Sequence, residues 1–178
     1  TQGPALPMPM AYFCAVPISP TSFITIHKDK IHEFDAAIAG PTSDQGWRES
    51  TRWPALKTSR SAHPGCAKLG NKVIIAGGKN GHNGRSLRST EVVDIVTRTI
   101  SAGGDMTSAR AYFNLATIIR GEGHKLFAIG GYDSLTKEVN TVEEWVEESS
   151  TWKEAESLTR ARRLFGVLSL PKESICPA

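Results

Sequence analysis

The stretches KVIIAGG (residues 72–78) and KLFAIGG (residues 125–131) decide the fold of this chain. Each is a run rich in Val, Ile or Phe that ends in two glycines, first Gly77 and Gly78, then Gly130 and Gly131. Such a run is typical of a β-strand, and the glycines suit a sharp turn that needs a positive φ or has no room for a Cβ. The two stretches are 53 residues apart, since 131 − 78 = 53.

An arginine before the next apolar run repeats with a similar period. It ends LKTSR, MTSAR and LTRAR, at Arg60, Arg110 and Arg162, with spacings of 50 and 52 residues. The step from the second glycine to the following arginine is 32 residues in one unit and 31 in the other. Two independent markers share one period and one phase, which indicates an internal repeat of about fifty residues.

The sequence between these markers also repeats. Trp152 precedes its arginine by 10 residues, and Ile100 stands 10 residues before Arg110, in the place of that tryptophan. Short Val-, Ile- and Phe-rich runs separated by Gly, Asn, Asp and Ser predict an all-β fold. The segment VEEWVEESSTWKEAESL is rich in helix-forming residues, but its tryptophans and its phase in the repeat favour a strand, a turn and a second strand.

A third, degenerate copy lies upstream. Its AYFCAV (residues 11–16) resembles AYFNLA (residues 111–116), and SFITI and KIHEFD predict two more strands. Between them, residues 28–29 predict a tight turn where the other copies carry the glycine pair and a long loop. Trp47 and Trp53 both fit the tryptophan position, and the sequence does not choose between them.

This pattern resembles the kelch repeat, which has four strands, a Gly-Gly after the second, aromatic residues at fixed offsets and then an arginine. The resemblance covers residues 8 to about 170 and implies a kelch-type β-propeller segment of four-stranded antiparallel blades. The predicted organisation is an N-terminal segment (1–7), a degenerate blade (8–60), two blades (61–110 and 111–162), and the first strand of a further blade with the tail (163–178).

The resemblance also implies roles for the recurrent residues. Trp152 would fill the wedge between neighbouring blades, with Trp145 where the family has a tyrosine, and burying a tryptophan contributes several kcal/mol. Arg60, Arg110 and Arg162 would tie blades together or line the channel, because a guanidinium offers several donors to backbone carbonyls.

Three blades and one strand leave a ring open, because propellers close with about four to eight blades. Bare sheet faces and edges invite aggregation. We therefore expect the remaining blades of a larger propeller to complete the ring, with closure by a second chain as the alternative.

The composition is that of a soluble globular protein, with 39% hydrophobic residues, 22% charged residues and a formal net charge of +3. No block of like charges points to nucleic acid or a membrane as a partner. Cys14 and Cys66 lie in apolar runs and are predicted to be small buried core residues, whereas Cys176 in a Pro-flanked tail fits a bridge. Three cysteines leave the compartment open between extracellular and cytoplasmic.

The binding surface of such a scaffold is expected at one mouth of the propeller. The loop KNGHNGRSLRS (residues 79–89) and its counterpart at residues 132–138 predict a polar, basic rim for an acidic or phosphorylated partner. The alternative is a solvated loop that simply tolerates polar residues. The candidate partner-binding residues are Asn80, His82, Asn83, Arg85, Arg88, Tyr132 and Asp133.

No motif in the sequence points to a catalytic residue, a metal ligand or a cofactor. The carboxylates of Glu143, Glu144, Glu147 and Glu148 fit a solvated strand edge. The prediction is a non-enzymatic protein-binding scaffold with a protein partner. The alternative is a propeller enzyme of the oxidase, mutarotase or iron-dependent lyase type, with its site largely in blades outside this segment.

Overall fold

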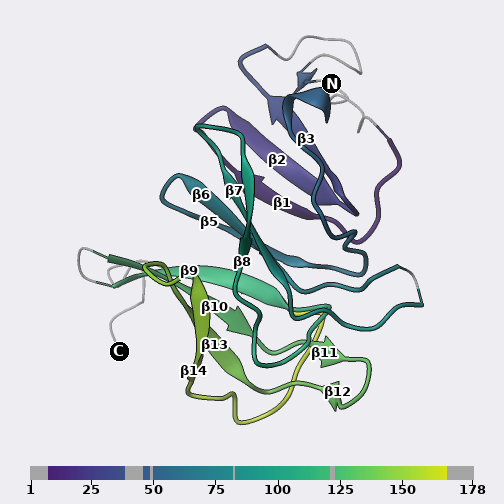
Figure 1. Cartoon of the computed structure of the whole chain (residues 1–178), viewed down its shortest axis with the longest axis vertical. Coiled ribbons are helices and arrows are strands. Elements are labelled where there is room, and N and C mark those ends of the chain that lie inside the picture. Colours follow the sequence, from purple (N-terminus) through teal and green to yellow (C-terminus); the bar gives the residue numbers. More distant parts are fainter. Residues whose placement is uncertain (1–7, 39–45, 49, 82, 121–122, 168–178) are drawn as a thin grey trace, which may run out of the picture.

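Three four-stranded antiparallel sheets follow one another along the chain in this computed structural model (Figure 1). The structure describes residues 8–38, 46–48, 50–81, 83–120 and 123–167. Within these residues the only helical element is the 3₁₀ turn η1 (Ser50–Arg52), so the predicted all-β, four-stranded blades are confirmed. The described part of the chain has no helix long and apolar enough to cross a membrane.

Each sheet is one blade, and its strands pair in chain order. Blade 1 has the order β1-β2-β3-β4, blade 2 β5-β6-β7-β8, and blade 3 β9-β10-β13-β14. The strands of blade 1 are β1 (Cys14–Pro17), β2 (Ser22–His27), β3 (Lys30–Asp35) and β4 (Trp47–Arg48). Those of blade 2 are β5 (Gly65–Leu69), β6 (Lys72–Ala76), β7 (Thr90–Asp94) and β8 (Ile100–Gly103). Those of blade 3 are β9 (Asn114–Arg120), β10 (Gly123–Ile129), β13 (Val142–Val146) and β14 (Thr151–Ala155), with the small hairpin β11 (Tyr132–Asp133) and β12 (Lys137–Glu138) inserted before β13.

Two local predictions are confirmed by the structure. Residues 28–29 form the tight turn between β2 and β3, and the helix-like segment of blade 3 forms β13, a turn and β14. Strand pairing also chooses between the two tryptophans of blade 1. Trp47 pairs with Phe34 as Trp152 pairs with Trp145, so Trp47 occupies the tryptophan position of the repeat.

The expected first strand of a further blade is not formed at residues 162–167, which carry no strand. This segment still follows the path of the equivalent linkers, because Gly131 N–H donates to the carbonyl of Arg162 (2.9 Å) as Gly78 N–H donates to that of Arg110 (2.9 Å). Among the described residues, a strand here would have no neighbouring strand with which to form a ladder. Residues 168–178, including Cys176, lie outside the described residues.

The core consists of two apolar clusters, one at each contact between blades. Alternate residues of β6 point to opposite faces, so Val73 and Ile75 pack toward blade 1 while Ile74 and Ala76 pack toward blade 3. Trp145 and Trp152 lie in the cluster between blades 2 and 3, with ring centroids 5.1 Å apart. The indole of Trp152 also donates to Thr90 Oγ1 of blade 2 at 2.9 Å.

Cys14 and Cys66 differ from their prediction as separate core residues. They form a disulfide, with Cα atoms 6.1 Å apart, that joins β1 of blade 1 to β5 of blade 2. Both side chains are half-buried rather than buried. The apolar residues around each cysteine could not show this pairing, because it depends on contact between the first strands of two adjacent blades, and the two cysteines lie 52 residues apart in sequence.

The loops divide between the two ends of the blades because the strands alternate in direction. The connections from second to third strand and the linkers between blades lie at one end, which we call the mouth. In the described chain the mouth comprises residues 8–13, 28–29, 53–64, 77–81, 83–89, 104–113, 130–141 and 156–167. Figure 1 shows the loop after β6 and the β11–β12 hairpin together on the right, away from the β5–β6 turn on the left.

Candidate functional site

A buried arginine fastens the linker at the mouth to the blade that follows it. Arg60 is fully buried and donates through Nη1 to the carbonyls of Gly77 (2.9 Å) and Ser89 (2.8 Å). Its other terminal nitrogen reaches the carboxylate of Glu91 at 3.1 Å. That carboxylate accepts from the backbone N–H groups of Lys57 and Thr58 in the same linker. We call this arrangement the latch.

Blade 3 repeats the latch. Arg110 is fully buried, donates to the carbonyls of Gly130 and Thr141 at 3.0 Å each, and pairs with Glu143. Burial lowers the pKa of both guanidinium groups, and their glutamate partners oppose that shift. Arg162, the third arginine of the series, is exposed.

Glu143 corrects the expected solvated acidic edge. Its carboxylate has no exposed surface and accepts from the backbone N–H groups of Thr107 (2.7 Å) and Ser108 (3.2 Å) in addition to Arg110. Glu147 and Glu148 are exposed. A signal was present in the sequence, because Glu143 follows Glu91 by 52 residues, which is one repeat.

The glycine pairs let the mouth close tightly over the latch. Gly77 and Gly130 have φ values of +63° and +58°, where residues with a Cβ are strained. A Cβ on Gly130 would also lie 2.7 Å from the carbonyl oxygen of Arg162, and one on Gly77 would collide with that of Arg110. Two constraints, conformation and space, therefore select glycine at this point of the repeat.

Four linker residues near the first strands of the blades share a left-handed backbone conformation. These corner residues are Tyr12, His63, Tyr112 and Leu164, with φ of 58°, 50°, 54° and 54°. Each of the last three donates a backbone hydrogen bond to the corner residue before it. His63 N–H donates to Tyr12 O (3.3 Å), Tyr112 N–H to His63 O (3.2 Å), and Leu164 N–H to Tyr112 O (3.0 Å). The strained backbone is thus used to connect successive blades.

The corner side chains gather into an aromatic cluster at the mouth. The rings of Tyr12 and His63 are 5.1 Å apart, and those of His63 and Tyr112 are 5.8 Å apart. Burial lowers the pKa of the His63 imidazole. The exposed fraction of Tyr12 is 52% and that of Leu164 is 65%, so the cluster presents apolar surface to solvent.

Two cations lie against the tyrosine rings of this cluster. Lys79 Nζ is 5.6 Å from the ring centroid of Tyr112 and 5.5 Å from that of Tyr132. The guanidinium of Arg163 is 4.8 Å from the same Tyr132 ring. Arg163 also pairs with Glu138 at 3.5 Å, whereas no carboxylate pairs with Lys79 among the described residues. We call Tyr112, Lys79, Tyr132 and Arg163 the mouth stack.

The predicted rim residues differ in their positions and contacts in the structure. Tyr132 belongs to the mouth stack, and Arg85, Asn80 and Asn83 are exposed on the loop beside it. Arg88 instead holds the linker, since its Nε donates to the carbonyl of Met106 at 2.7 Å. Asp133 caps its own turn by accepting from Leu135 N–H at 3.0 Å. His82 lies outside the described residues.

The two mouth loops are joined to each other by a pair of serines. Ser86 N–H donates to Ser134 Oγ at 3.0 Å, and Ser134 N–H donates to Ser86 Oγ at 3.1 Å. Sequence reasoning missed these serines, the corner residues and Lys79, because none forms a recognisable motif. Their position depends on contacts between neighbouring blades.

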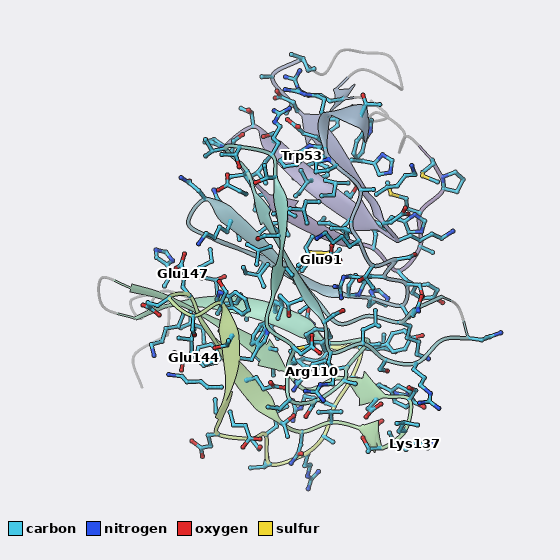
Figure 2. All side chains as sticks on the ribbon, viewed as in Figure 1. Trp53, Glu91, Arg110, Lys137, Glu144 and Glu147 are labelled. Carbon is cyan, nitrogen blue, oxygen red and sulfur yellow. A yellow bond between two sulfur atoms is a disulfide. The ribbon has the colours of Figure 1, made fainter. Side chains whose placement is uncertain are left out.

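The mouth carries an excess of positive charge. Apart from the paired Arg60 and Arg110, its described loops hold nine cations and five carboxylates, an excess of 9 − 5 = 4. The cations are Lys28, Lys57, Lys79, Arg85, Arg88, Lys137, Arg160, Arg162 and Arg163. The carboxylates are those of Asp29, Asp105, Asp133, Glu138 and Glu156. Figure 2 shows Lys137 at the mouth, and Glu144 and Glu147 on the opposite side of the blades.

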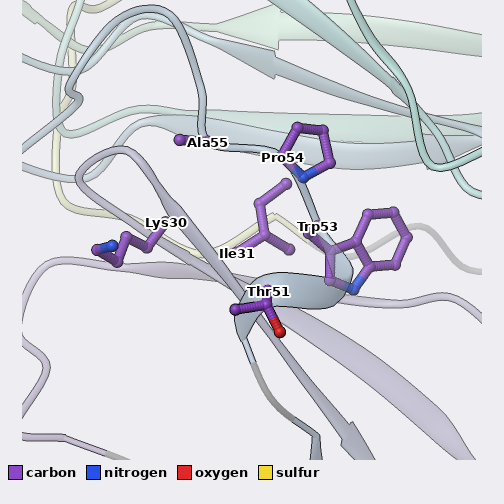
Figure 3. A pocket seen from close by; sticks show the side chains of 6 residues that line it. All are labelled: Lys30, Ile31, Thr51, Trp53, Pro54 and Ala55. Carbon is purple, nitrogen blue, oxygen red and sulfur yellow. The ribbon is translucent and has the colours of Figure 1, made fainter.

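Two pockets lie near these elements. One, of about 310 Å³, is lined at the mouth by His63, Tyr112, Phe113, Asn114, Leu164 and Phe165. The other is smaller, about 170 Å³, and lies beside β3 of blade 1, where Ile31 points toward Pro54 (Figure 3). The smaller pocket is mainly apolar. The described residues contain no group of three or more His, Cys, Asp or Glu side chains suited to a metal ion.

Three consecutive four-stranded blades, two of which carry a glycine pair and a latch, define a repeat protein of the propeller class. The family model for the kelch motif matches residues 60–107 and 123–159. The chain therefore carries two kelch motifs and has the fold of a kelch-type β-propeller segment, as the sequence predicted.

Comparison with solved structures supports the same fold. A structure titled "Structure of YjhT" aligns with a TM-score of 0.67 over 88% of this chain, at 12% sequence identity. The chain spans about half the length of that structure, 54% of it. The search of curated proteins found no match.

Proposed function

We propose that this propeller segment is a protein-binding module that captures an acidic or phosphorylated partner segment at its mouth. The observation that carries the proposal is Lys79, held between the rings of Tyr112 and Tyr132 without a carboxylate partner in the described chain. A cation against aromatic faces is partly desolvated and positioned, so it pairs more strongly with an incoming anion than a freely moving lysine does.

The surroundings of Lys79 suit a peptide better than an isolated ion. Tyr12 and Leu164 offer exposed apolar surface next to the stack, and Arg85 is exposed on the adjoining loop. Interfaces typically combine aromatic anchors with a charged, solvated rim. A segment with acidic residues beside an apolar one would match both features.

Binding of a fluorescent oligoglutamate peptide, followed by anisotropy, tests the proposal. We expect Lys79→Glu to weaken binding about tenfold or more, since one attraction becomes a repulsion. Lys153→Glu is the matched control, because Lys153 is an exposed lysine on β14 that contacts Glu144 outside the mouth. Equal affinity of the Lys79→Glu variant and the wild-type chain would refute the role of the mouth stack.

Closure of the ring is part of the same proposal. Blade 1 turns Ile24 and Ile26 toward blade 2, which leaves Phe23, Phe34 and Trp47 clustered and half-buried on its other face. We propose that further blades of the same propeller cover this face, with a second chain as the alternative. Native mass measured against denaturing mass separates the options, and a lone 19.3 kDa monomer with a stable fold would contradict both.

A further inference from the structure

Blade 1 lacks the latch that fastens blades 2 and 3. Met10 precedes the corner residue Tyr12 by two residues, as the buried Arg110 precedes Tyr112, so Met10 takes the position of the arginine. The position of the glutamate is taken by His32. Two equivalent hydrogen bonds align the blades, because Leu56 N–H donates to Asp29 O as Met106 N–H donates to Arg88 O. His32 follows Asp29 by three residues, as Glu91 follows Arg88. His32 is buried with Nε2 unpartnered, so this blade has no buried ion pair in the latch position.

Blade 1 has a covalent fastening instead. The Cys14–Cys66 disulfide joins β1 to β5, the first strands of adjacent blades. Blades 2 and 3 meet through the first strands β5 and β9 without a cysteine on β9. The blade without a latch is therefore the one that carries the bridge.

The bridge is also close to the mouth. Tyr12 precedes Cys14 by two residues and accepts a hydrogen bond from His63 N–H, which in turn precedes Cys66 by three residues. The same two residues form the first ring contact of the aromatic cluster, at 5.1 Å. The disulfide thus links β1 to β5 close to the points where these strands follow Tyr12 and His63.

We propose that the Cys14–Cys66 disulfide is a redox control on the mouth, which fixes Tyr12 when oxidised and releases blade 1 from blade 2 when reduced. In the reaction a dithiol reductant supplies two electrons and two protons. The S–S bond is broken, Cys14 and Cys66 become thiols, and the dithiol becomes a cyclic disulfide. The control of partner binding rests on the proposed function, whereas the release of blade 1 does not.

Hydrogen exchange of the full chain, with and without a dithiol, tests the release of blade 1. We expect exchange in residues 22–35 to accelerate about tenfold or more on reduction, since the bridge restrains opening of this blade. Exchange in β10 and β13 should stay unchanged. A Cys14→Ser/Cys66→Ser variant should show the fast exchange without reductant, and Cys176→Ser should behave as the wild type.

Two results would overturn the proposal. One is equal exchange of residues 22–35 in the oxidised and reduced chain. The other is quantitative alkylation of both Cys14 and Cys66 in protein prepared without a reductant, which would show that the bridge does not form. Oligoglutamate binding is measured separately on the same samples. Faster exchange with unchanged peptide affinity would retain the structural role of the bridge and reject its control of the mouth.

Discussion

A buried guanidinium is costly, because it must leave water, and each latch compensates with several partners. Arg60 and Arg110 each donate to two carbonyls and one carboxylate, all from elements that meet at the mouth. Lysine, a single point charge, could not satisfy these separated acceptors in the same way. The arginine therefore specifies how linker, glycine turn and third strand fit together in each blade.

Removing one partner of a latch should destabilise the chain strongly. Arg110→Met leaves the fully buried Glu143 without its cation, which typically costs about 3–5 kcal/mol. Lys125→Met removes a lysine that pairs with Glu144 at the surface and should cost at most about 1 kcal/mol. Denaturant unfolding of both variants measures the difference. Equal losses would show that burial of the pair carries no special cost.

Two aspartates at equivalent turns should make stability fall in acid. Hydrogen bonds from the Thr97 and Val96 N–H groups lower the pKa of Asp94, and the Arg48 hydrogen bond lowers that of Asp35. A depressed folded pKa contributes stability above the unfolded value of about 3.9, and this is lost as the pH falls through the folded pKa. In unfolding measured from pH 5 to pH 2, Asp94→Asn should show a shallower decline than the wild type. An unchanged slope would contradict the assignment.

At the scale of the elements, a strand pair depends on the turn that follows it. In blades 2 and 3 a glycine with positive φ follows the second strand and turns the chain beneath the next linker. Blade 1 avoids this requirement, because β2 and β3 are joined by residues 28–29 alone. The degenerate blade is therefore degenerate in its turn as well as in its latch.

Gly77→Ala should be far more destabilising than Gly81→Ala, although both glycines have positive φ. A Cβ on Gly77 would collide with the carbonyl oxygen of Arg110 and would lie 2.7 Å from the Phe113 ring, whereas nothing lies within 4 Å of a Cβ on Gly81. We expect about 1 kcal/mol for Gly81→Ala from conformation alone, and about 3 kcal/mol or more for Gly77→Ala. Thermal unfolding compares the two. Similar losses would mean that the linker moves aside without cost.

Local patterns predicted the elements better than their contacts. Glycine pairs, apolar runs and the repeat period were enough for the strands, even for the helix-like letters of β13 and β14. Glu143 was misread as a surface residue because its burial depends on Arg110 of a linker 33 residues earlier in the chain. The disulfide and the mouth stack were missed for the same reason, since each joins residues from different repeats.

At the scale of the whole molecule, charge is distributed unevenly along the direction of the strands. The mouth loops hold an excess of four positive charges in the described chain, as counted above from nine cations and five carboxylates. The formal net charge of the complete sequence is only +3, so this concentration at one end is larger than the overall value suggests. A field of this kind accelerates the approach of an acidic partner and orients it toward the mouth.

The salt dependence of partner binding should therefore separate the long-range attraction by the mouth cations from the direct contacts of the bound partner. Raising ionic strength from about 0.05 M to about 0.5 M shortens the Debye length from roughly 14 Å to roughly 4 Å, so distant mouth cations no longer contribute. We expect the association rate of the oligoglutamate peptide to fall about tenfold or more, with a smaller change in its dissociation rate. Arg160→Gln/Arg162→Gln should reduce the salt dependence, because neither side chain has an ion pair in the described chain. Stopped-flow fluorescence measures both rates, and an association rate insensitive to salt would show that the mouth attracts its partner through apolar contact instead of charge.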